Sequence, residues 1–189
     1  MGVLVVIRHG QTEWSASGRH TSYTDLELTD DGERQARELG ARLAGRNFAA
    51  VLSSPRKRAL RTAELAGLTV SDVDDDLVEW DYGEYEGLTT KQIRSVRPDW
   101  SLWTDGCPGG ESPEEVGARL DGVLERAGAP LDQGDVVLVA HGHCLRVAAA
   151  RWIGLPPAGG GLFRLDTGTL SELGHEHGRP VILQWNGGR

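Results

Sequence analysis

Two continuous apolar runs rich in β-branched residues, Val3 to Ile7 and Val136 to Ala140, constrain the fold of this chain most strongly. Neither run alternates apolar and polar residues, so each predicts a strand that is buried on both faces, as in a parallel sheet. A shorter run, Ala49 to Leu52, predicts a third strand of the same kind. Such strands require helices on both faces of their sheet.

Helix signals lie between these runs. Thr29 precedes apolar residues at helical spacing and predicts a capped helix. Ser54 followed by Pro55 predicts a second helix with Ser54 as its cap. The segment from Ser112 to Glu115 has the pattern of a capping box, and residues from about 143 to 153 predict a further helix.

The C-terminal third is different, because glycines separate three short apolar segments: Leu162 to Leu165, Thr169 to Leu173 and Val181 to Trp185. We expect these segments to form short strands at one side of the sheet. The length of 189 residues suits one domain. We therefore expect residues 1–189 to form a single α/β domain, a three-layer α/β/α sandwich with a mainly parallel central sheet.

Composition narrows the classes of partner. A net charge of −8 argues against a general nucleic-acid binder or a binder of anionic membranes, because those proteins present basic surfaces. Cys107 and Cys144 lie in unrelated contexts and predict free thiols. The first apolar run is too short for a signal peptide, and no stretch approaches membrane-spanning length. We expect a cytoplasmic, soluble monomer or small oligomer such as a homodimer.

Histidines follow two of the predicted strands. His9 and His141 each come at a strand end and precede a glycine, and the third strand leads into a segment that carries Arg58. A lone histidine at a strand end is more often structural than catalytic, and arginines on a helix more often form a solvated face. However, the carboxyl ends of parallel strands meet at one edge of a sheet, where α/β proteins bind ligands. This joint arrangement favours a functional site.

Five motifs in this order resemble those of the histidine phosphatase superfamily, also called phosphoglycerate mutase-like proteins. They are Arg8 to Trp14, Ser53 to Ala59, Glu79 to Gly87, Gly109 to Ser112 and Ala140 to Gly142. The resemblance spans residues 3 to about 152 and implies the phosphoglycerate mutase-like fold.

The resemblance also implies roles for individual residues. His9 is the expected nucleophile, neutral at the attacking nitrogen and converted to phosphohistidine. A backbone carbonyl that accepts from its other ring nitrogen would fix the tautomer. Arg8 and Arg58 are expected to bind phosphate oxygens through planar, charge-assisted donors, and His141, if protonated, would add another donor.

Glu79 is expected to protonate the leaving group and then to activate water. Glu84 and Glu86 are competing candidates by proximity. The expected substrate contacts are Gln11, Thr12, Ser15, Thr21, Ser22, Tyr82, Gly142 and His143.

The sequence disfavours three alternatives: a metal site, a cysteine phosphatase and a non-catalytic scaffold. The pair His141 and His143 has ligand spacing, but without neighbouring carboxylates or cysteines it is weak evidence for a metal, so we expect no metal and no other cofactor. A cysteine phosphatase needs an arginine at a fixed spacing after the cysteine, and Cys107 has Pro113 there. A scaffold that binds phosphate ligands without catalysis is disfavoured, because the expected nucleophile and arginines are all present.

Within the family, phosphate hydrolysis is favoured over the phosphoglycerate mutase reaction, which depends on bisphosphoglycerate. The chain lacks the paired arginines of the mutases, and Ser15 and the run Thr21 to Tyr23 depart from the family's usual residues. Other features resemble a branch with fungal sedoheptulose-1,7-bisphosphatase and actinobacterial acid phosphatases. The expected substrate is a small phosphorylated metabolite, either a sugar phosphate or a phosphoglycerate-type acid. A rim suited to a polyol is expected from His20, Tyr23, Tyr82, Trp103 and His143.

Overall fold

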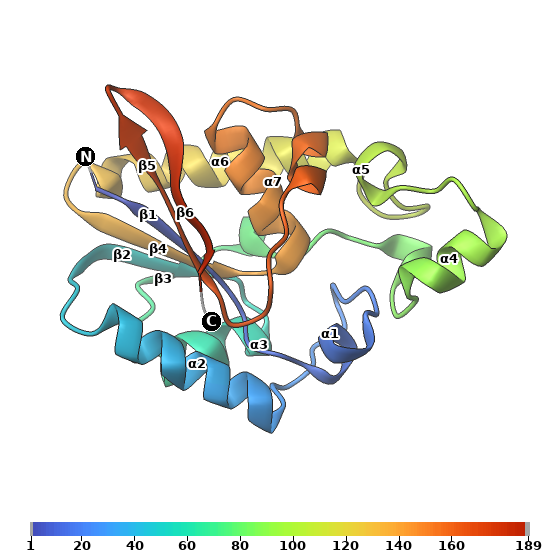
Figure 1. Ribbon diagram of the computed structural model, residues 1–189, viewed down its shortest axis with the longest axis horizontal. Helices are drawn as coiled ribbons and strands as arrows, with labels where there is room; N and C mark the ends of the chain where they lie inside the picture. The colour runs from blue at the N-terminus through green and yellow to red at the C-terminus, as the bar shows by residue number, and fades with distance from the viewer. Residues whose placement is uncertain (1, 188–189) are drawn as a thin grey trace.

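The computed structural model describes residues 2–187 and places a six-stranded sheet between two layers of helices (Figure 1). The strands are β1 (Leu4–Arg8), β2 (Phe48–Ser53), β3 (Asp72–Val73), β4 (Asp135–Ala140), β5 (Leu170–Glu176) and β6 (Arg179–Gly187). Their spatial order is β3-β2-β4-β1-β5-β6. The first four strands are parallel, and β5 is antiparallel to both of its neighbours. The predicted three-layer sandwich with a mainly parallel sheet is confirmed.

The long helices cover the two faces of the sheet. They are α2 (Asp30–Leu43) and α3 (Lys57–Leu65) on one face, and α6 (Pro113–Leu131) and α7 (Gly142–Trp152) on the other (Figure 1). None of the helices that the structure describes is both long and apolar enough to cross a membrane.

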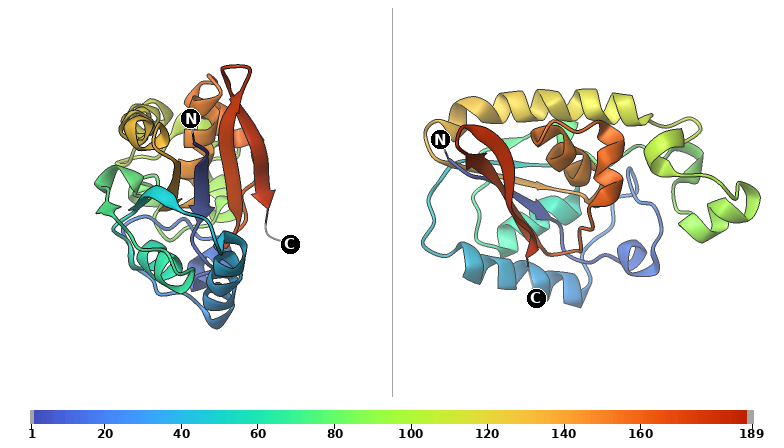
Figure 2. Two further views of the ribbon diagram at one scale, coloured as in Figure 1. Left: turned by 90° about the vertical axis from the view of Figure 1, so that its left-hand side faces the viewer. Right: turned by 45° about the horizontal axis from the view of Figure 1, so that its top comes forward.

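Short helices gather beyond the carboxyl ends of β1 and β4. They are α1 (Glu13–Ser17), α4 (Thr90–Val96) and α5 (Leu102–Asp105), with 3-10 turns η1 (Asp75–Leu77), η2 (Gly83–Tyr85) and η3 (Pro157–Leu162). Figure 2 shows α4 and α5 projecting past that end of the sheet. The sheet thus leaves its carboxyl edge open to loops and short helices, and the site described below lies there.

Alternate residues of β1 explain why its sequence is apolar throughout. Leu4 and Val6 pack in the cluster formed with α6 and α7, whereas Val5 and Ile7 pack in the cluster formed with α2 and α3. All four side chains are fully buried. Burial of such a side chain contributes about 1.5–3 kcal/mol, so the two faces together hold β1 at the centre of the molecule.

Two of the predicted helix caps are confirmed. The Thr29 hydroxyl accepts from the backbone N–H of Gly32 at 3.1 Å and caps α2. Ser112 and Glu115 form the reciprocal bonds of a capping box at the start of α6. The helix predicted near residues 143 to 153 is also confirmed, as α7.

The prediction that Ser54 caps the following helix is wrong. The helix α3 begins at Lys57, and the cap position is taken by Arg56, which makes no side-chain capping bond. The Ser54 hydroxyl accepts from the backbone N–H of Arg56 at 3.4 Å, ahead of the helix, and makes its shorter bond, at 2.7 Å, to Nε2 of His141. A tertiary contact therefore outweighs the local capping preference.

The strand predicted from Leu162 to Leu165 is also wrong. Leu162 ends the 3-10 turn η3, and the next residues form no strand. The reason is that their carbonyls bind side chains: Trp185 donates to the carbonyl of Arg164, and Arg8 donates to the carbonyl of Leu165. The other two C-terminal segments form β5 and β6 as predicted.

Candidate active site

The sheet register brings the two motif histidines together. Arg8 pairs with Ala140 across the parallel strands β1 and β4, so His9 and His141 follow at matching positions. Their ring centroids are 5.2 Å apart, with the planes inclined at 64°. Ser53 at the end of β2 pairs with Val139, so the segment that leads into α3 reaches the same edge. The predicted convergence of three strand ends is confirmed.

His9 is a buried, neutral imidazole, only 5% exposed. Its Nδ1–H donates to the carbonyl of Gly10 at 2.7 Å, and because a carbonyl only accepts, the proton must be on Nδ1. Burial lowers the pKa of His9 well below its ordinary value, and the charges of Arg58 and Arg8 lower it further. The lone pair therefore lies on Nε2, as an in-line nucleophile requires.

His141 is neutral in the opposite tautomer. Nε of Arg58 donates to Nδ1 of His141 at 3.1 Å, so the ring proton lies on Nε2 and is donated to the Ser54 hydroxyl. Burial lowers the pKa of His141 well below its ordinary value, with Arg58 the next cause. His141 therefore presents one N–H donor without the extra proton that the sequence interpretation allowed for.

Arg58 is fully buried behind the two histidines. Its Nη groups donate to the backbone carbonyls of Thr21, Ser22 and Thr24 at 3.1–3.2 Å. The guanidinium thus holds this loop and lowers the pKa of His9 by its charge. Its predicted contact with phosphate oxygens stays a prediction, because Arg58 is not among the residues that line the cavity.

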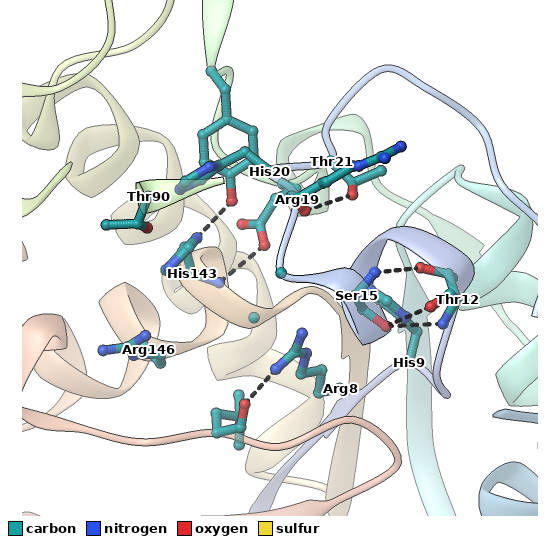
Figure 3. Close-up of a pocket in the computed structure, with 15 residues that line it drawn as sticks. Arg8, His9, Thr12, Ser15, Arg19, His20, Thr21, Thr90, His143 and Arg146 are labelled. Atoms are coloured by element: carbon teal, nitrogen blue, oxygen red, sulfur yellow. Dashed lines mark hydrogen bonds between the residues drawn. The ribbon is translucent and has the colours of Figure 1, made fainter. Parts of the chain in front are cut away.

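A cavity of about 250 Å³ lies beside His9 (Figure 3). It is somewhat smaller than the pockets that bind drug-sized ligands and suits a small metabolite. It is lined by Arg8, His9, Thr12, Ser15, Gly18, Arg19, His20, Thr21, Glu79, Tyr82, Thr90, Gly142, His143, Arg146 and Leu165. Most of the predicted contact residues are therefore brought together.

Gln11 and Ser22 are not among the residues that line the cavity, so their predicted substrate contacts stay predictions. The side-chain oxygen of Gln11 accepts from the Thr29 hydroxyl at 3.0 Å, at the start of α2. The hydroxyl of Ser22 is buried and donates to the carbonyl of Glu79 at 3.2 Å. Both side chains are thus used in holding loops.

Arg8 places a desolvated positive charge in the cavity wall. One of its Nη groups donates to the carbonyl of Leu165, while its buried Nε has no hydrogen-bond partner among the described residues. Gly142 allows this approach, since a Cβ at that position would lie 3.1 Å from Cζ of Arg8. A buried guanidinium with an unsatisfied donor favours an anion in the adjacent space.

Glu79 is held by the first amides of α7. Its Oε1 accepts from the backbone N–H groups of Trp80 at 2.9 Å and Cys144 at 2.8 Å, and its Oε2 accepts from that of His143 at 2.9 Å. The side chain is 5% exposed and lines the cavity. Because Oε1 accepts two bonds and Oε2 one, Oε2 has the capacity to carry a transferable proton.

The two competing carboxylates lie elsewhere. Glu84 is exposed to solvent. Glu86 accepts from the backbone N–H groups of Ser22 and Thr24 at 2.9–3.2 Å and so holds the loop that Arg58 binds from its other side. Neither residue lines the cavity, which leaves Glu79 as the carboxylate placed for proton transfer.

Neutral aromatic side chains form one wall. The hydroxyl of Tyr82 bonds with Nδ1 of His143, and Nδ1–H of His20 donates to the carbonyl of Leu88 at 2.7 Å. Burial lowers the pKa of both histidines and raises that of Tyr82 well above its ordinary value. These groups offer hydrogen bonds without charge.

Five lining residues were missed as site residues: Gly18, Arg19, Thr90, Arg146 and Leu165. A signal for Arg146 was present, because it follows His143 by one helical turn and so shares its face of α7. Arg19 and Thr90 come from loop and short-helix positions that only the tertiary fold brings together.

The cysteines are buried free thiols, as predicted. Burial raises the pKa of Cys107 to about 12 and that of Cys144 further, so neither forms a thiolate nucleophile near neutrality. Within residues 2–187 no group of three or more histidine, cysteine, aspartate or glutamate side chains is arranged to hold a metal ion.

Comparison with known proteins gives consistent matches along the whole chain. The sequence model of the histidine phosphatase superfamily (branch 1) matches residues 4–187. An acid phosphatase of Mycobacterium tuberculosis is 49% identical over 178 residues, which cover 93% of this chain and 87% of that protein. The sedoheptulose 1,7-bisphosphatase of Saccharomyces cerevisiae is 38% identical over 182 residues, covering 80% and 67%. A solved structure from Mycobacterium tuberculosis superposes with a TM-score of 0.95 at 45% identity, covering 98% of this chain and 97% of that one.

Proposed function

The chain belongs to the histidine phosphatase superfamily (branch 1), and from this premise we propose that it hydrolyses small phosphate monoesters through a phosphohistidine on His9, without a metal cofactor. The observation that carries the proposal is the neutral His9, with its lone pair on Nε2, beside the desolvated charge of Arg8 in one cavity. Phosphoryl transfer needs such a pairing, because the anionic phosphate repels a nucleophile until its charge is balanced.

In the first step, Nε2 of His9 attacks phosphorus, and the bond from phosphorus to the ester oxygen breaks. The leaving oxygen takes the proton from Oε2 of Glu79, so a neutral alcohol departs. Arg8 binds the transferred phosphoryl oxygens, and Arg58 adds its charge from behind the histidines.

In the second step, Glu79 takes a proton from a water molecule as the water oxygen attacks phosphorus. The bond from phosphorus to His9 breaks, inorganic phosphate is released, and Glu79 is again protonated for the next cycle. His141 stays neutral beside His9, with its Nε2–H donated to the Ser54 hydroxyl.

The relatives support sugar phosphates as substrates, since they include a sedoheptulose 1,7-bisphosphatase, and phosphoglycerate-type acids belong to the same proposal. An enzyme of the acid phosphatase type is supported by the acid phosphatase relative and by the lowered pKa of His9, which keeps the nucleophile neutral in mild acid. A single domain over residues 1–189, a cytoplasmic location and a monomeric or homodimeric state belong to the same proposal.

Trapping of the phosphoenzyme tests the proposal. We expect wild-type protein to hydrolyse p-nitrophenyl phosphate in the presence of a chelator and to yield an acid-labile phosphoprotein on quenching. His9→Ala should lose both signals, and His177→Asn is the control, because His177 lies exposed in the β5–β6 hairpin. Phosphoprotein in the His9 variant, or wild-type activity that the chelator abolishes, would contradict the proposal.

A further inference from the structure

Arg146 lies at the part of the cavity remote from His9. In Figure 3 Arg8 lies between His9 and Arg146, and α7 contributes Arg146 to the cavity lining together with Gly142 and His143. The cavity is therefore longer than the phosphoryl site alone requires. Its remote end has a cation of its own.

The Arg146 guanidinium is held in place on three sides. Nε donates to the carbonyl of Gly160 at 3.0 Å, Nη2 donates to that of Gly161 at 3.3 Å, and Cζ lies 4.4 Å from the ring centroid of Trp103. Nη1 makes no hydrogen bond to the described residues, so its donors remain for a ligand. The glycines permit this packing, since a Cβ on Gly160 or Gly161 would lie 2.7 or 3.0 Å from Trp103.

No carboxylate neutralises this cation by direct contact. Within residues 2–187, Arg146 forms no ion pair. Glu79 is the one carboxylate among the residues that line the cavity, and it acts electrostatically on Arg8 as well as on Arg146. Burial lowers the pKa of Arg146 to about 10, so the side chain is still charged at neutral pH. A preorganised, partly desolvated guanidinium of this kind fits an anionic oxygen group.

Neutral polar rings line the same cavity as the two arginines. His143 and His20 have their rings nearly parallel at a centroid distance of 6.0 Å, and both rings line the cavity. Because Nδ1–H of His20 bonds to a backbone carbonyl, its Nε2 can accept from a ligand hydroxyl. Two separated cations with neutral hydrogen-bonding groups in one cavity match a hydroxylated chain with an anion at each end.

We propose that Arg146 binds a second anionic group of the substrate, a phosphate or a carboxylate, at the end remote from the phosphate that His9 attacks. This inference rests on the proposed function and sharpens its substrate class. The preferred substrates are then bisphosphorylated sugars or phosphorylated hydroxy acids, and Arg146 is a specificity-determining residue.

Matched substrates with and without the remote anion test the inference. The pairs are fructose 1,6-bisphosphate with fructose 1-phosphate, and 3-phosphoglycerate with glycerol 3-phosphate, so the two pairs separate a phosphate from a carboxylate. For wild type we expect a higher kcat/KM for the doubly anionic member of at least one pair. In Arg146→Gln the ratio within that pair should fall by about 10- to 100-fold, mostly through KM, as expected for loss of one charge-assisted contact.

Two further variants control for structure. Arg146→Lys should restore part of the ratio, because it keeps the charge without the planar fork. Arg151→Gln should leave the ratio unchanged, because Arg151 is on the same helix but pairs with Asp121 away from the cavity. An unchanged ratio in Arg146→Gln, with p-nitrophenyl phosphate still hydrolysed, would overturn the inference and leave the proposed function standing.

Binding without turnover separates the two proposals. We expect His9→Ala to bind fructose 1,6-bisphosphate or 3-phosphoglycerate, by calorimetry, about 10- to 100-fold more tightly than the double variant His9→Ala with Arg146→Gln. Equal affinities for both ligands would overturn the role of Arg146. A wild-type protein that hydrolyses none of the esters, while this difference in affinity persists, would overturn the proposed function alone.

Discussion

At the scale of the residue, the three carboxylates of the acidic motif have different surroundings and so different tasks. Glu79 lines the cavity and is held by three backbone amides, whereas Glu86 accepts from the loop amides of Ser22 and Thr24. Glu84 is exposed. Chemistry that depends on a proton from a carboxyl group should therefore respond to Glu79 alone, and loop geometry should respond to Glu86.

Substitution of Glu79 should make the rate depend on the leaving group. We expect Glu79→Gln to slow hydrolysis of an alkyl phosphate by about 10²- to 10⁴-fold, because an alkoxide leaves poorly without a proton. The loss for p-nitrophenyl phosphate should be much smaller, because nitrophenolate is a stable anion. Steady-state kcat/KM values for the two esters check this expectation.

The other two glutamates provide the controls for that experiment. Glu86→Gln should reduce kcat/KM by the same factor for both esters, and Glu84→Gln should change neither. Equal losses for both esters in Glu79→Gln would show that Glu79 is not the proton donor.

At the scale of the element, the first turn of α7 organises the site. Its amides hold Glu79, Gly142 lies against the Arg8 guanidinium, and His143 lies one turn before Arg146 on the same face. The start of one helix thus sets the relative positions of the proton donor and of the cations at both ends of the cavity. A small change in this turn should alter ligand binding more than stability.

Gly142→Ala tests that expectation. A Cβ would lie 3.1 Å from Cζ and 3.2 Å from Nε of Arg8, so the guanidinium must shift. We expect the inhibition constant of inorganic phosphate to rise by about one order of magnitude, which corresponds to about 1.5 kcal/mol of a charge-assisted contact. Urea unfolding should show no comparable loss, because alanine favours the helix.

A glycine elsewhere in a helix is the matched control. Gly128 in α6 has nothing within 4 Å of its added Cβ. Gly128→Ala should stabilise the protein by about 0.5–1 kcal/mol and leave phosphate inhibition unchanged. If inorganic phosphate inhibited Gly142→Ala as strongly as wild type, the close contact between Gly142 and Arg8 would have no role in phosphate binding.

Elements set by local pattern were predictable from the sequence, and those set by tertiary contacts were not. The doubly buried strands were read correctly from their apolar runs, and the meeting of His9 with His141 follows from parallel pairing of those strands. Ser54 was misassigned because its bond to His141 joins residues distant in the chain. Arg146 follows His143 by one helical turn but was missed, because its placement in the cavity also depends on Trp103 and the glycines of η3.

At the scale of the whole molecule, an acidic chain encloses a group of neutral imidazoles. The net charge is −8, yet Arg8 and Arg146 bring positive charge to the cavity. His9, His141 and His143 all have a pKa well below the ordinary value, with burial as the largest cause. Each would take up a proton in the unfolded chain at a higher pH than in the folded protein.

Stability should therefore fall as the pH drops below about 6.5, the ordinary pKa of histidine. Each such group binds more protons in the unfolded state there, so each removes up to about 1.4 kcal/mol per pH unit from the free energy of unfolding until its folded-state pKa is reached. Urea unfolding between about pH 7.5 and 5 measures the slope.

A variant assigns the slope to a particular side chain. His143→Gln should have a shallower pH dependence than wild type, because one titrating group is removed, whereas His177→Asn should match wild type, since His177 is exposed. A free energy of unfolding that is constant or rises on acidification over this range would contradict the expectation.

The bonds from Glu79 to the first amides of α7 have one more consequence. Free helix N-termini are ready-made anion sites, but this one is already satisfied by an internal carboxyl group. The incoming ester must then be captured by guanidinium groups, and carbonyls outside the first turn of α7 hold those of Arg8 and Arg146 in place. Capture and protonation are therefore assigned to different groups, so a substitution that weakens capture should leave the geometry of protonation unchanged.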